Sequence, residues 1–250
     1  MKAFVLIFTL IMTLDAVAQQ SVVVPMKAQT LIDAYPDMHL TYRDNKIVFP
    51  DGTEIVYDDG KQKNFVETLD YSDVEDMFSM EYDTTSAAPK YLNDCGRSRS
   101  EALFNKMYGS TAAEVQKNLV KIEWFGQQIP ITKINGVDKH LTAVYQELKD
   151  RPELRKYLLQ ASSFYWRQVR GANRLSAHSY GIAFDINVAN SNYWLWANKG
   201  KTETDSIKYA NRIPMEIVRI FERHGFIWGG RWYHYDTMHF EYRPEFLGRK

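Results

Sequence analysis

Two histidines and two aspartates in this sequence are the residue types of a catalytic zinc site. In the segment SAHSYGIAFD, His178 stands seven residues before Asp185. More than 50 residues later, in the segment DTMHFE, Asp236 stands three residues before His239. Two histidines and one carboxylate satisfy three positions of a tetrahedral zinc ion and leave the fourth open, which is the composition of catalytic sites. Zinc lowers the pKa of a water at that position from about 15.7 toward about 7, and a nearby carboxylate accepts its proton.

The surrounding sequence offers a base and a positive charge for such chemistry. Asp236 and Glu241 are both close enough to His239 in the sequence to serve as the base. An oxyanion that forms on an attacked carbonyl needs a positive group. Three arginines precede the first motif in YWRQVRGANRLSAH: Arg167, Arg170 and Arg174. Each residue taken singly also has a structural explanation, so spacing alone leaves a metal site and a hydrogen-bonded polar cluster both open.

Short strands and a turn are the elements that must position these side chains. After Gly181 the residues alternate, which predicts a strand that projects Asp185 from one face. Glycine readily adopts a positive φ, which would turn the chain back and bring His178 near that carboxylate. The run TMHFEY predicts a second strand with His239 and Glu241 on the same face.

Periodicity and turn residues predict the other elements of the chain. They are a hairpin within residues 45–60, a helix over 111–122 with Ser110 as N-cap, a strand over 129–134, an amphipathic helix from Val137 toward Lys149, and a helix that begins at Pro214 and ends just before Gly225 as its C′ residue.

Composition and charge exclude several classes of protein. The 250 residues are 45% hydrophobic and 25% charged, which is ordinary for a globular protein. The 31 basic and 31 acidic residues give no net charge, so binding to nucleic acid has no electrostatic support. Cys95 is the only cysteine, which excludes an intramolecular disulfide, and its neighbours NDCGRSR favour a packed thiol over a nucleophile.

The first 18 residues have the pattern of a secretory signal peptide. Lys2 precedes an apolar run from Ala3 to Leu14, and Ala16-Val17-Ala18 resembles a cleavage site. The run is too short to span a hydrocarbon core of about 30 Å, so we expect no stable membrane insertion. The sequence therefore predicts an exported protein, periplasmic or secreted, with a short membrane-associated anchor as the alternative for this segment.

The segment that follows, residues 19–95, is acidic and rich in turns. Its irregularly spaced aspartates raise the question of calcium: Asp58, Asp59, Asp70, Asp73 and Asp76. No D-x-[DN]-x-[DN]-G loop is present, so a solvated acidic face is favoured. We interpret this segment as an N-terminal extension of unknown role.

The two motifs resemble those of a known family. SAHSYGIAFD resembles the S-x-H-x-x-G-x-A-x-D motif of the zinc D-alanyl-D-alanine metallopeptidases, and DTMHFE resembles their carboxylate-x-x-H motif. Because the carboxylate of the second motif is an aspartate, the sequence most resembles the branch of the family that includes phage L-alanyl-D-glutamate endolysins. The resemblance covers roughly Phe164 to Tyr242 and implies an α+β fold, a small antiparallel sheet with flanking helices, of the hedgehog/DD-peptidase type.

The resemblance also implies a role for each motif residue. His178, Asp185 and His239 match the zinc ligands, and Asp236 matches the general base. Because every motif position is present, the resemblance argues against an inactive enzyme.

The resemblance leaves alternatives for two further roles, the oxyanion-binding arginine and the residue that orients His239. Arg167 best matches the arginine that binds the substrate carbonyl and steadies the oxyanion, with Arg170 as its rival. Glu241 shares a strand face with His239, so it is expected to orient that histidine and is the rival base.

The resemblance predicts a zinc peptidase domain over residues 96–250. Its reaction would be hydrolysis of peptidoglycan stem peptides by metal-activated water, either as a D-Ala-D-Ala carboxypeptidase or as an L-Ala-D-Glu type endopeptidase. The signalling domain of hedgehog proteins keeps the metal site while acting as a binding module. A zinc-stabilised binding module for cell-wall peptides or a protein partner is therefore the alternative, and a metal-free structural envelope protein is a weaker third hypothesis.

Overall fold

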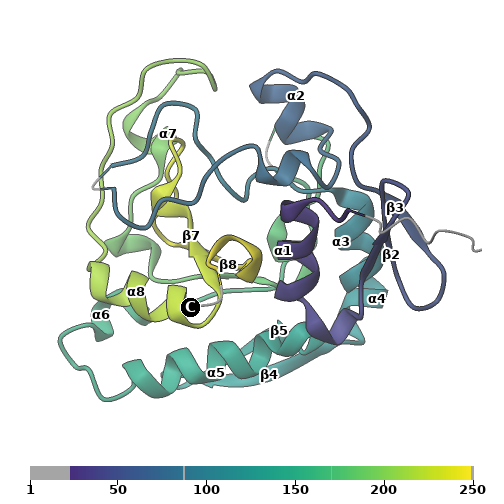
Figure 1. The fold of residues 1–250 in the computed structure, drawn as a ribbon. Coiled ribbons are helices and arrows are strands. Elements are labelled where there is room, and N and C mark those ends of the chain that lie inside the picture. The colour runs from purple at the N-terminus through teal and green to yellow at the C-terminus, as the bar shows by residue number, and fades with distance from the viewer. Residues whose placement is uncertain (1–22, 87, 170, 249–250) are drawn as a thin grey trace, which may run out of the picture.

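The computed structural model describes residues 23–86, 88–169 and 171–248, which form helices and small antiparallel sheets (Figure 1). This arrangement confirms the predicted α+β class. The predicted signal peptide and Arg170 lie outside the described residues. Within the described ranges, none of the helices combines the length and the apolar character that crossing a membrane requires.

The helices and strands alternate irregularly along the chain. The helices are α1 (Met26–Ala34), α2 (Phe65–Asp70), α3 (Glu101–Tyr108), α4 (Ala112–Gln116), α5 (Val137–Leu148), α6 (Arg155–Leu158), α7 (Trp194–Ala197) and α8 (Met215–Arg223). The strands are β1 (Thr41–Arg43), β2 (Lys46–Val48), β3 (Glu54–Val56), β4 (Leu119–Trp124), β5 (Gln127–Thr132), β6 (Ala183–Asp185), β7 (Phe226–Trp228) and β8 (His239–Tyr242).

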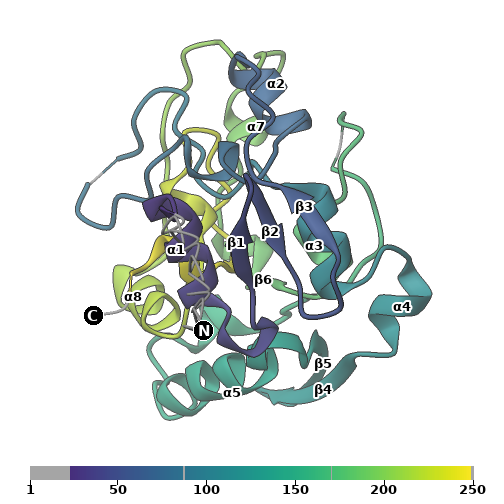
Figure 2. The same cartoon turned by 45° about the vertical axis from the view of Figure 1, so that its right-hand side comes forward.

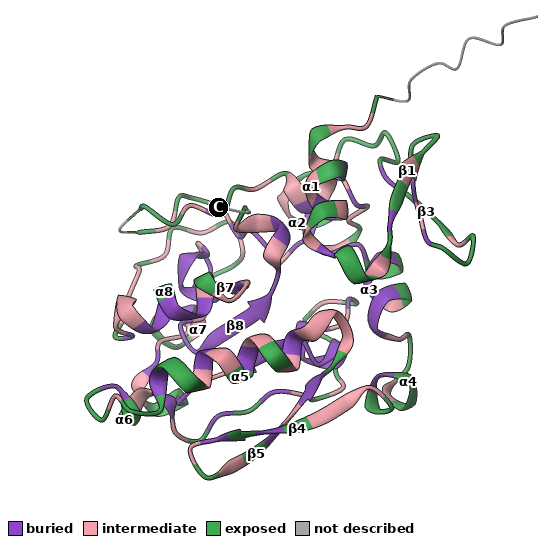
Figure 3. Ribbon diagram, turned by 60° about the horizontal axis from the view of Figure 1, so that its bottom comes forward, coloured by how far each residue is buried: buried purple, intermediate pink, exposed green. Residues whose placement is uncertain are grey.

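The central sheet has the strand order β6-β8-β7, and both pairings are antiparallel. Strand β8 is buried along its whole length (Figure 3). Its Phe240 stacks on Phe221 of α8 with ring centroids 3.9 Å apart, so the apolar stripe of α8 covers one face of this sheet. The opposite face of the strand carries His239 and Glu241, as the alternation in TMHFEY predicts.

A hairpin of β4 and β5 supports the central sheet together with α5 (Figure 1). Trp124 at the end of β4 contacts Phe184 of β6 with centroids 4.6 Å apart, and its indole N–H donates to the Leu158 carbonyl at 2.8 Å. Helix α5 buries Val137 and Leu148 among the apolar positions that predicted it. The hairpin and helix thus form a packed base beneath the strand that holds Asp185.

The helix expected over residues 111–122 ends early. Helix α4 stops at Gln116, and Leu119–Trp124 forms a strand because it pairs over six positions with β5. The first turn is capped by Thr111, whose hydroxyl accepts from the Glu114 N–H at 3.3 Å, and not by Ser110. Tertiary pairing here overrides the local helical pattern.

The N-terminal extension packs against the rest of the chain. Strands β2 and β3 form the predicted hairpin, and β1 completes a three-stranded sheet. Figure 2 shows α1 between α8 and this sheet, and α1 contacts the 3₁₀ turn Pro244–Phe246 near the C-terminus. Residues from both parts belong to one core cluster, among them Ala28, Leu31, Ile47, Phe184, Phe221 and Phe240. The boundary between residues 95 and 96 stays a prediction.

Candidate metal centre

The structure brings together the three side chains that the motifs single out. One ligand atom each from His178, Asp185 and His239 lie within 4.8 Å of one another. Asp185 Oδ2 is 3.2 Å from His178 Nε2, and Asp185 Oδ1 is 3.0 Å from His239 Nδ1. Asp185 and His239 are register partners on β6 and β8, which places their side chains on the same face of the sheet.

A turn at Gly181 brings His178 to these strands. His178 lies in the 3₁₀ turn Ala177–Tyr180, whose N-cap Ser176 accepts from the His178 N–H at 3.4 Å. Gly181 ends the turn with φ of 68°, in the left-handed region. A Cβ there would lie 2.7 Å from Leu119 Cδ2, so the close packing against β4 also requires glycine. The turn expected from the sequence is therefore present.

Each histidine is oriented by a partner on its other ring nitrogen. His178 Nδ1 is 2.6 Å from the Ser163 carbonyl oxygen, and His239 Nε2 is 3.3 Å from Glu241 Oε2. If these nitrogens carry the protons, each ring keeps a lone pair on the nitrogen that faces Asp185. This is the arrangement in which histidine ligands are held for a metal. Two imidazole nitrogens and one carboxylate, all pre-oriented, fit a zinc ion.

The electrostatics of the cluster favour a cation. Burial acts to raise the pKa of Asp185, but His178 and His239 outweigh it and hold the pKa below its usual range. Burial acts to lower the pKa of His239, but Asp185 and Glu241 raise it to about 10. A proton on His239 thus supplies, in the metal-free cluster, part of the positive charge that a divalent cation would bring.

Asp236 provides a free carboxylate in the same cavity. Its Oδ1 is buried and has no hydrogen-bond partner among the described residues. Burial and the negative charge of Asp185 raise the pKa of Asp236 to about 7. The backbone around it is fixed, because the His239 N–H donates to the Asp236 carbonyl at 3.2 Å. An unpaired carboxylate with a pKa near neutrality suits a group that accepts and returns a proton.

Glu241 is held in a different way. It is fully buried, and Arg99 and Arg243 approach its carboxylate at 3.4 Å and 3.1 Å. Burial acts to raise its pKa, but Arg99, His239 and Arg243 lower the pKa of Glu241 to about 2. A carboxylate with this many partners is suited to orient His239.

A cavity of about 420 Å³ contains the cluster and several arginines. Arg167 lines it but is exposed, and its Nη1 donates to the Gln168 carbonyl at 3.3 Å. Arg174 lines it as well and pairs with Asp70. Arg170, the rival of Arg167, lies outside the described residues.

Two arginines in the cavity wall were missed by the sequence reasoning. Arg97 and Arg99 come from the segment GRSRS just before α3, about 80 residues ahead of His178. Arg99 is buried, and its guanidinium donates to the Gly96 carbonyl at 2.9 Å as well as to Glu241. The paired arginines were visible in the sequence, but nothing in their spacing relates them to the motifs.

Aromatic side chains cover part of the cavity. Trp194, Trp196 and Trp232 line it, and Trp196 is 50% exposed. By contrast, Trp228 and Tyr235 are buried in the protein interior. The aromatic wall is therefore made mainly by the segment around α7.

A second group of potential metal ligands already contains a cation. Asp94, Glu203 and His234 have ligand atoms within 4.8 Å of one another. The Arg97 guanidinium lies 2.5 Å from Asp94 Oδ2 and 3.0 Å from Glu203 Oε1. His234 Nδ1 lies 2.6 Å from Asp94 Oδ2.

The acidic face of the extension is arranged similarly. Asp58, Asp59 and Asp73 lie together, and the Lys63 ammonium reaches Asp59 and Asp73 at 3.0 Å and 3.3 Å. The Lys63 side chain is largely buried. A lysine thus supplies positive charge within this acidic cluster.

Cys95 is a packed thiol, as the sequence predicts. It is buried beside Trp232, whose indole N–H donates to the Cys95 carbonyl at 2.5 Å. Burial raises the pKa of the thiol well above its ordinary value. The thiolate needed for nucleophilic chemistry is therefore disfavoured.

A comparison with known families finds a match over the segment that holds the metal-site residues. Residues 170–242 match the family described as D-alanyl-D-alanine carboxypeptidase. The matched segment holds His178, Asp185, Asp236 and His239, and the family is zinc-dependent in general. Arg97, Arg99 and the N-terminal extension lie outside the match. Neither curated proteins nor solved structures gave a match to this chain.

Proposed function

We propose that this protein is a zinc-dependent peptidase that hydrolyses the stem peptides of peptidoglycan. One observation carries the proposal: the three potential ligands converge within 4.8 Å in a cavity that also holds the unpaired carboxylate of Asp236. All four residues lie in the segment that matches the carboxypeptidase family. A polar cluster with a structural role alone would not need a free buried carboxylate beside it.

In this proposal His178, Asp185 and His239 hold the zinc ion. When bound, zinc supplies a water of lowered pKa and polarises the scissile carbonyl. Ser163 and Glu241 fix the rings of the two histidines, so little ordering of these side chains is needed when the metal binds.

Asp236 is the proposed general base. Its Oδ1 has no partner to compete for the proton of the attacking water. The carboxylate is placed to accept that proton and then deliver it to the leaving amine. Glu241 is proposed to position His239 and to take no part in proton transfer.

The positive charge that steadies the oxyanion is proposed to come from an arginine in the cavity wall. The family resemblance assigns it to Arg167, whereas burial favours Arg99, whose guanidinium also donates to Glu241 and to the Gly96 and Leu175 carbonyls. A buried guanidinium in a low-dielectric wall stabilises developing charge more strongly than an exposed one. We therefore propose Arg99 for this contact and Arg167 for a contact with a more distant part of the peptide.

The proposed substrate agrees with the proposed compartment. Residues 1–18 have the pattern of an export signal, and the substrate would lie outside the cytoplasm. We accordingly propose a periplasmic or secreted location. Both terminal D-Ala-D-Ala cleavage and internal L-Ala-D-Glu cleavage are compatible with a wall that combines arginines and tryptophans.

The test is hydrolysis of one defined pentapeptide muropeptide, with products identified by mass spectrometry. Zinc-loaded protein is expected to release D-alanine if it cuts the terminal bond, or the tetrapeptide that begins with D-Glu if it cuts the L-Ala-D-Glu bond, and chelator-treated protein is expected to release neither. Asp236→Ala should keep zinc and lose turnover. If Asp236→Ala loses nothing and the loaded wild type binds stem peptides without cutting them, the binding-module alternative replaces the peptidase.

A further inference from the structure

A chain of buried polar contacts leads from the N-terminal extension to the ligand His239. The hydroxyl of Tyr35 donates to Glu245 Oε2 at 2.7 Å, and Arg243 Nε donates to Glu245 Oε1 at 2.6 Å. Arg243 Nη1 then donates to Glu241 Oε1 at 3.1 Å. The other oxygen of Glu241 lies 3.3 Å from His239 Nε2. Four consecutive contacts therefore join the end of α1 to the proposed metal site.

Every residue in this chain of polar contacts is shielded from solvent. The exposed fractions of Tyr35, Glu245, Arg243, Glu241 and His239 are 1%, 3%, 0%, 0% and 7%. Polar contacts in a low-dielectric interior are strengthened, and a group that loses its partner there is strongly destabilised. Carboxylate, guanidinium and carboxylate alternate along the chain, so the position of each charged group is set by the next.

We infer that Tyr35 of the N-terminal extension is a positioning residue for the metal site, acting through Glu245, Arg243 and Glu241 on the ring of His239. The inference rests on the proposed zinc site and goes beyond it. It assigns the extension a part in metal binding, although the extension lies outside the family match.

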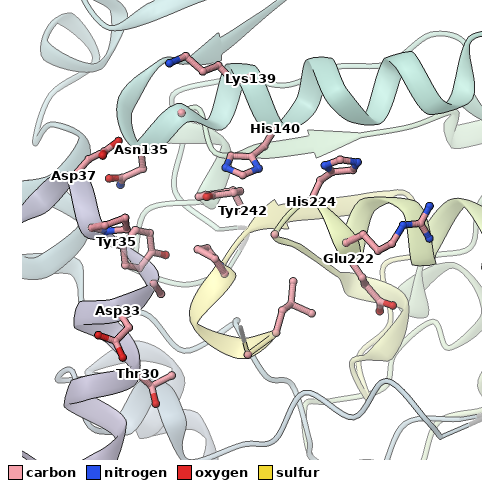
Figure 4. Close-up of a pocket in the computed structure, with 18 residues that line it drawn as sticks. Thr30, Asp33, Tyr35, Asp37, Asn135, Lys139, His140, Glu222, His224 and Tyr242 are labelled. Carbon is pink, nitrogen blue, oxygen red and sulfur yellow. The ribbon is translucent and has the colours of Figure 1, made fainter. Parts of the chain in front are cut away.

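The surroundings of Tyr35 favour this role over a simple surface hydrogen bond. Tyr35 follows α1 directly and lines a cavity of about 690 Å³ (Figure 4). Figure 4 shows it on the α1 side of this cavity, with His140 and Tyr242 on the other side. Although the cavity is adjacent, the Tyr35 hydroxyl is bonded to Glu245, and burial together with Glu245 raises its pKa well above the ordinary value. The hydroxyl therefore stays a donor to Glu245.

A second contact fixes the middle of the chain. The Gly96 carbonyl accepts from Nη1 of both Arg99 and Arg243 at 2.9 Å. Gly96 has φ of 98°, and a Cβ there would lie 2.3 Å from Ile227 Cδ1 and 3.1 Å from Glu241 Oε1. Glycine is required at this position, because a side chain would push into the contacts that hold Glu241. Arg243 Nη1 thus bonds to both the Gly96 carbonyl and Glu241, and its Nε bonds to Glu245, so a change in how Glu245 holds this guanidinium alters its contact with Glu241.

The test compares Tyr35→Phe with Tyr108→Phe in the full chain. Tyr108 is a matched control, since it is equally buried and its hydroxyl has one partner, Asn135 Nδ2 at 3.0 Å, outside the chain of contacts. Zinc affinity is measured by chelator competition, and the ligand field is measured from the visible absorption of the cobalt(II) form. Outer contacts of metal ligands typically contribute about 10- to 100-fold to affinity, and Tyr35 is more remote, so we expect a loss of about 3- to 10-fold.

The expected result is weaker zinc binding and shifted cobalt bands for Tyr35→Phe, with wild-type values for Tyr108→Phe. Glu245→Gln should shift the same bands further, and circular dichroism verifies that each variant is folded. Wild-type affinity and spectra in both Tyr35→Phe and Glu245→Gln overturn the inference alone. A wild-type protein that binds no zinc overturns the proposed function as well, so the two failures are distinguishable.

Discussion

Asp185 and His239 face each other across neighbouring antiparallel strands, and Asp185 Oδ1 lies 3.0 Å from His239 Nδ1. His178 reaches the other carboxylate oxygen from a turn at a distance of 3.2 Å. Since a register slip of one residue moves a strand's side chains to the opposite face, the β6–β8 pairing decides whether a metal site exists.

Replacing the central ligand should abolish zinc binding. Asp185→Asn removes the charge that both histidines approach, so we expect the zinc affinity to fall by more than about 100-fold, beyond the range of outer-contact variants. Metal content after dialysis, measured by mass spectrometry, checks this. Asp44→Asn, at an exposed position, serves as the control and should retain zinc. Stoichiometric zinc in Asp185→Asn would exclude this residue as a ligand.

Asp236 and Glu241 should respond differently to loss of charge. We expect Asp236→Asn to keep zinc and to lower kcat by about 10²- to 10⁴-fold, the usual contribution of a general base. Glu241→Gln should instead weaken zinc binding by about 10- to 100-fold because it orients His239. Parallel measurement of kcat and zinc content separates the two roles. An Asp236→Asn variant with wild-type turnover would return Glu241 to consideration as the base.

Two arginines compete for the oxyanion contact, and matched lysine variants distinguish them. Arg99→Lys should lower kcat by about 10²- to 10³-fold, as loss of an oxyanion donor does. Arg167→Lys should lower it less than about tenfold, since an exposed charge is weakened by solvent. Zinc content is measured alongside kcat because Arg99 also contacts Glu241. The reverse order of losses would assign the contact to Arg167, as the sequence motif suggests.

Metal removal should destabilise the folded protein. A ligand at 100 times its Kd stabilises a protein by about 2.7 kcal/mol, and for a chain of this size about 1 kcal/mol corresponds to about 2 to 4 °C in Tm. Chelation of zinc should therefore lower Tm by about 5 to 10 °C in calorimetry. Asp185→Asn should show no such shift on chelation. An equal shift in both proteins would place the stabilising metal elsewhere.

The buried Asp94 should contribute to stability in a pH-dependent way. Burial acts to raise its pKa, but Arg97 and His234 lower it below the unfolded value of about 3.9. The contribution is then complete above about pH 4 and is lost as the pH falls through the folded pKa. Asp94→Asn should cost about 3 to 5 kcal/mol at pH 7, because it leaves buried partners unpaired.

Urea unfolding from pH 2 to 7 tests this dependence. The difference in unfolding free energy between the wild type and Asp94→Asn should shrink below about pH 4. A difference that stays constant down to pH 2 would mean that Asp94 has an unperturbed pKa. The exposed Asp44→Asn variant should track the wild type throughout.

Local patterns predicted the parts of the fold that depend on near neighbours. The alternation after Gly181 and in TMHFEY indicated the faces of β6 and β8, and the apolar spacing from Val137 to Leu148 indicated α5. These predictions succeeded because side-chain direction follows backbone periodicity, which is a property of a short segment. The helix expected over 111–122 failed at Leu119, where pairing with β5 decides the outcome.

The sequence by itself determined which residues are of the types that can bind a metal or act as its base, and the order in which they occur: His178, Asp185, Asp236 and His239. Only the tertiary structure decided which side chains surround them. Arg99 enters the cavity from about 80 residues upstream, and Tyr35 reaches His239 through Glu245, which lies 210 residues later in the chain. Such contacts leave no periodic trace in the sequence, because they arise when separate elements pack, and packing depends on shape and burial over the whole chain.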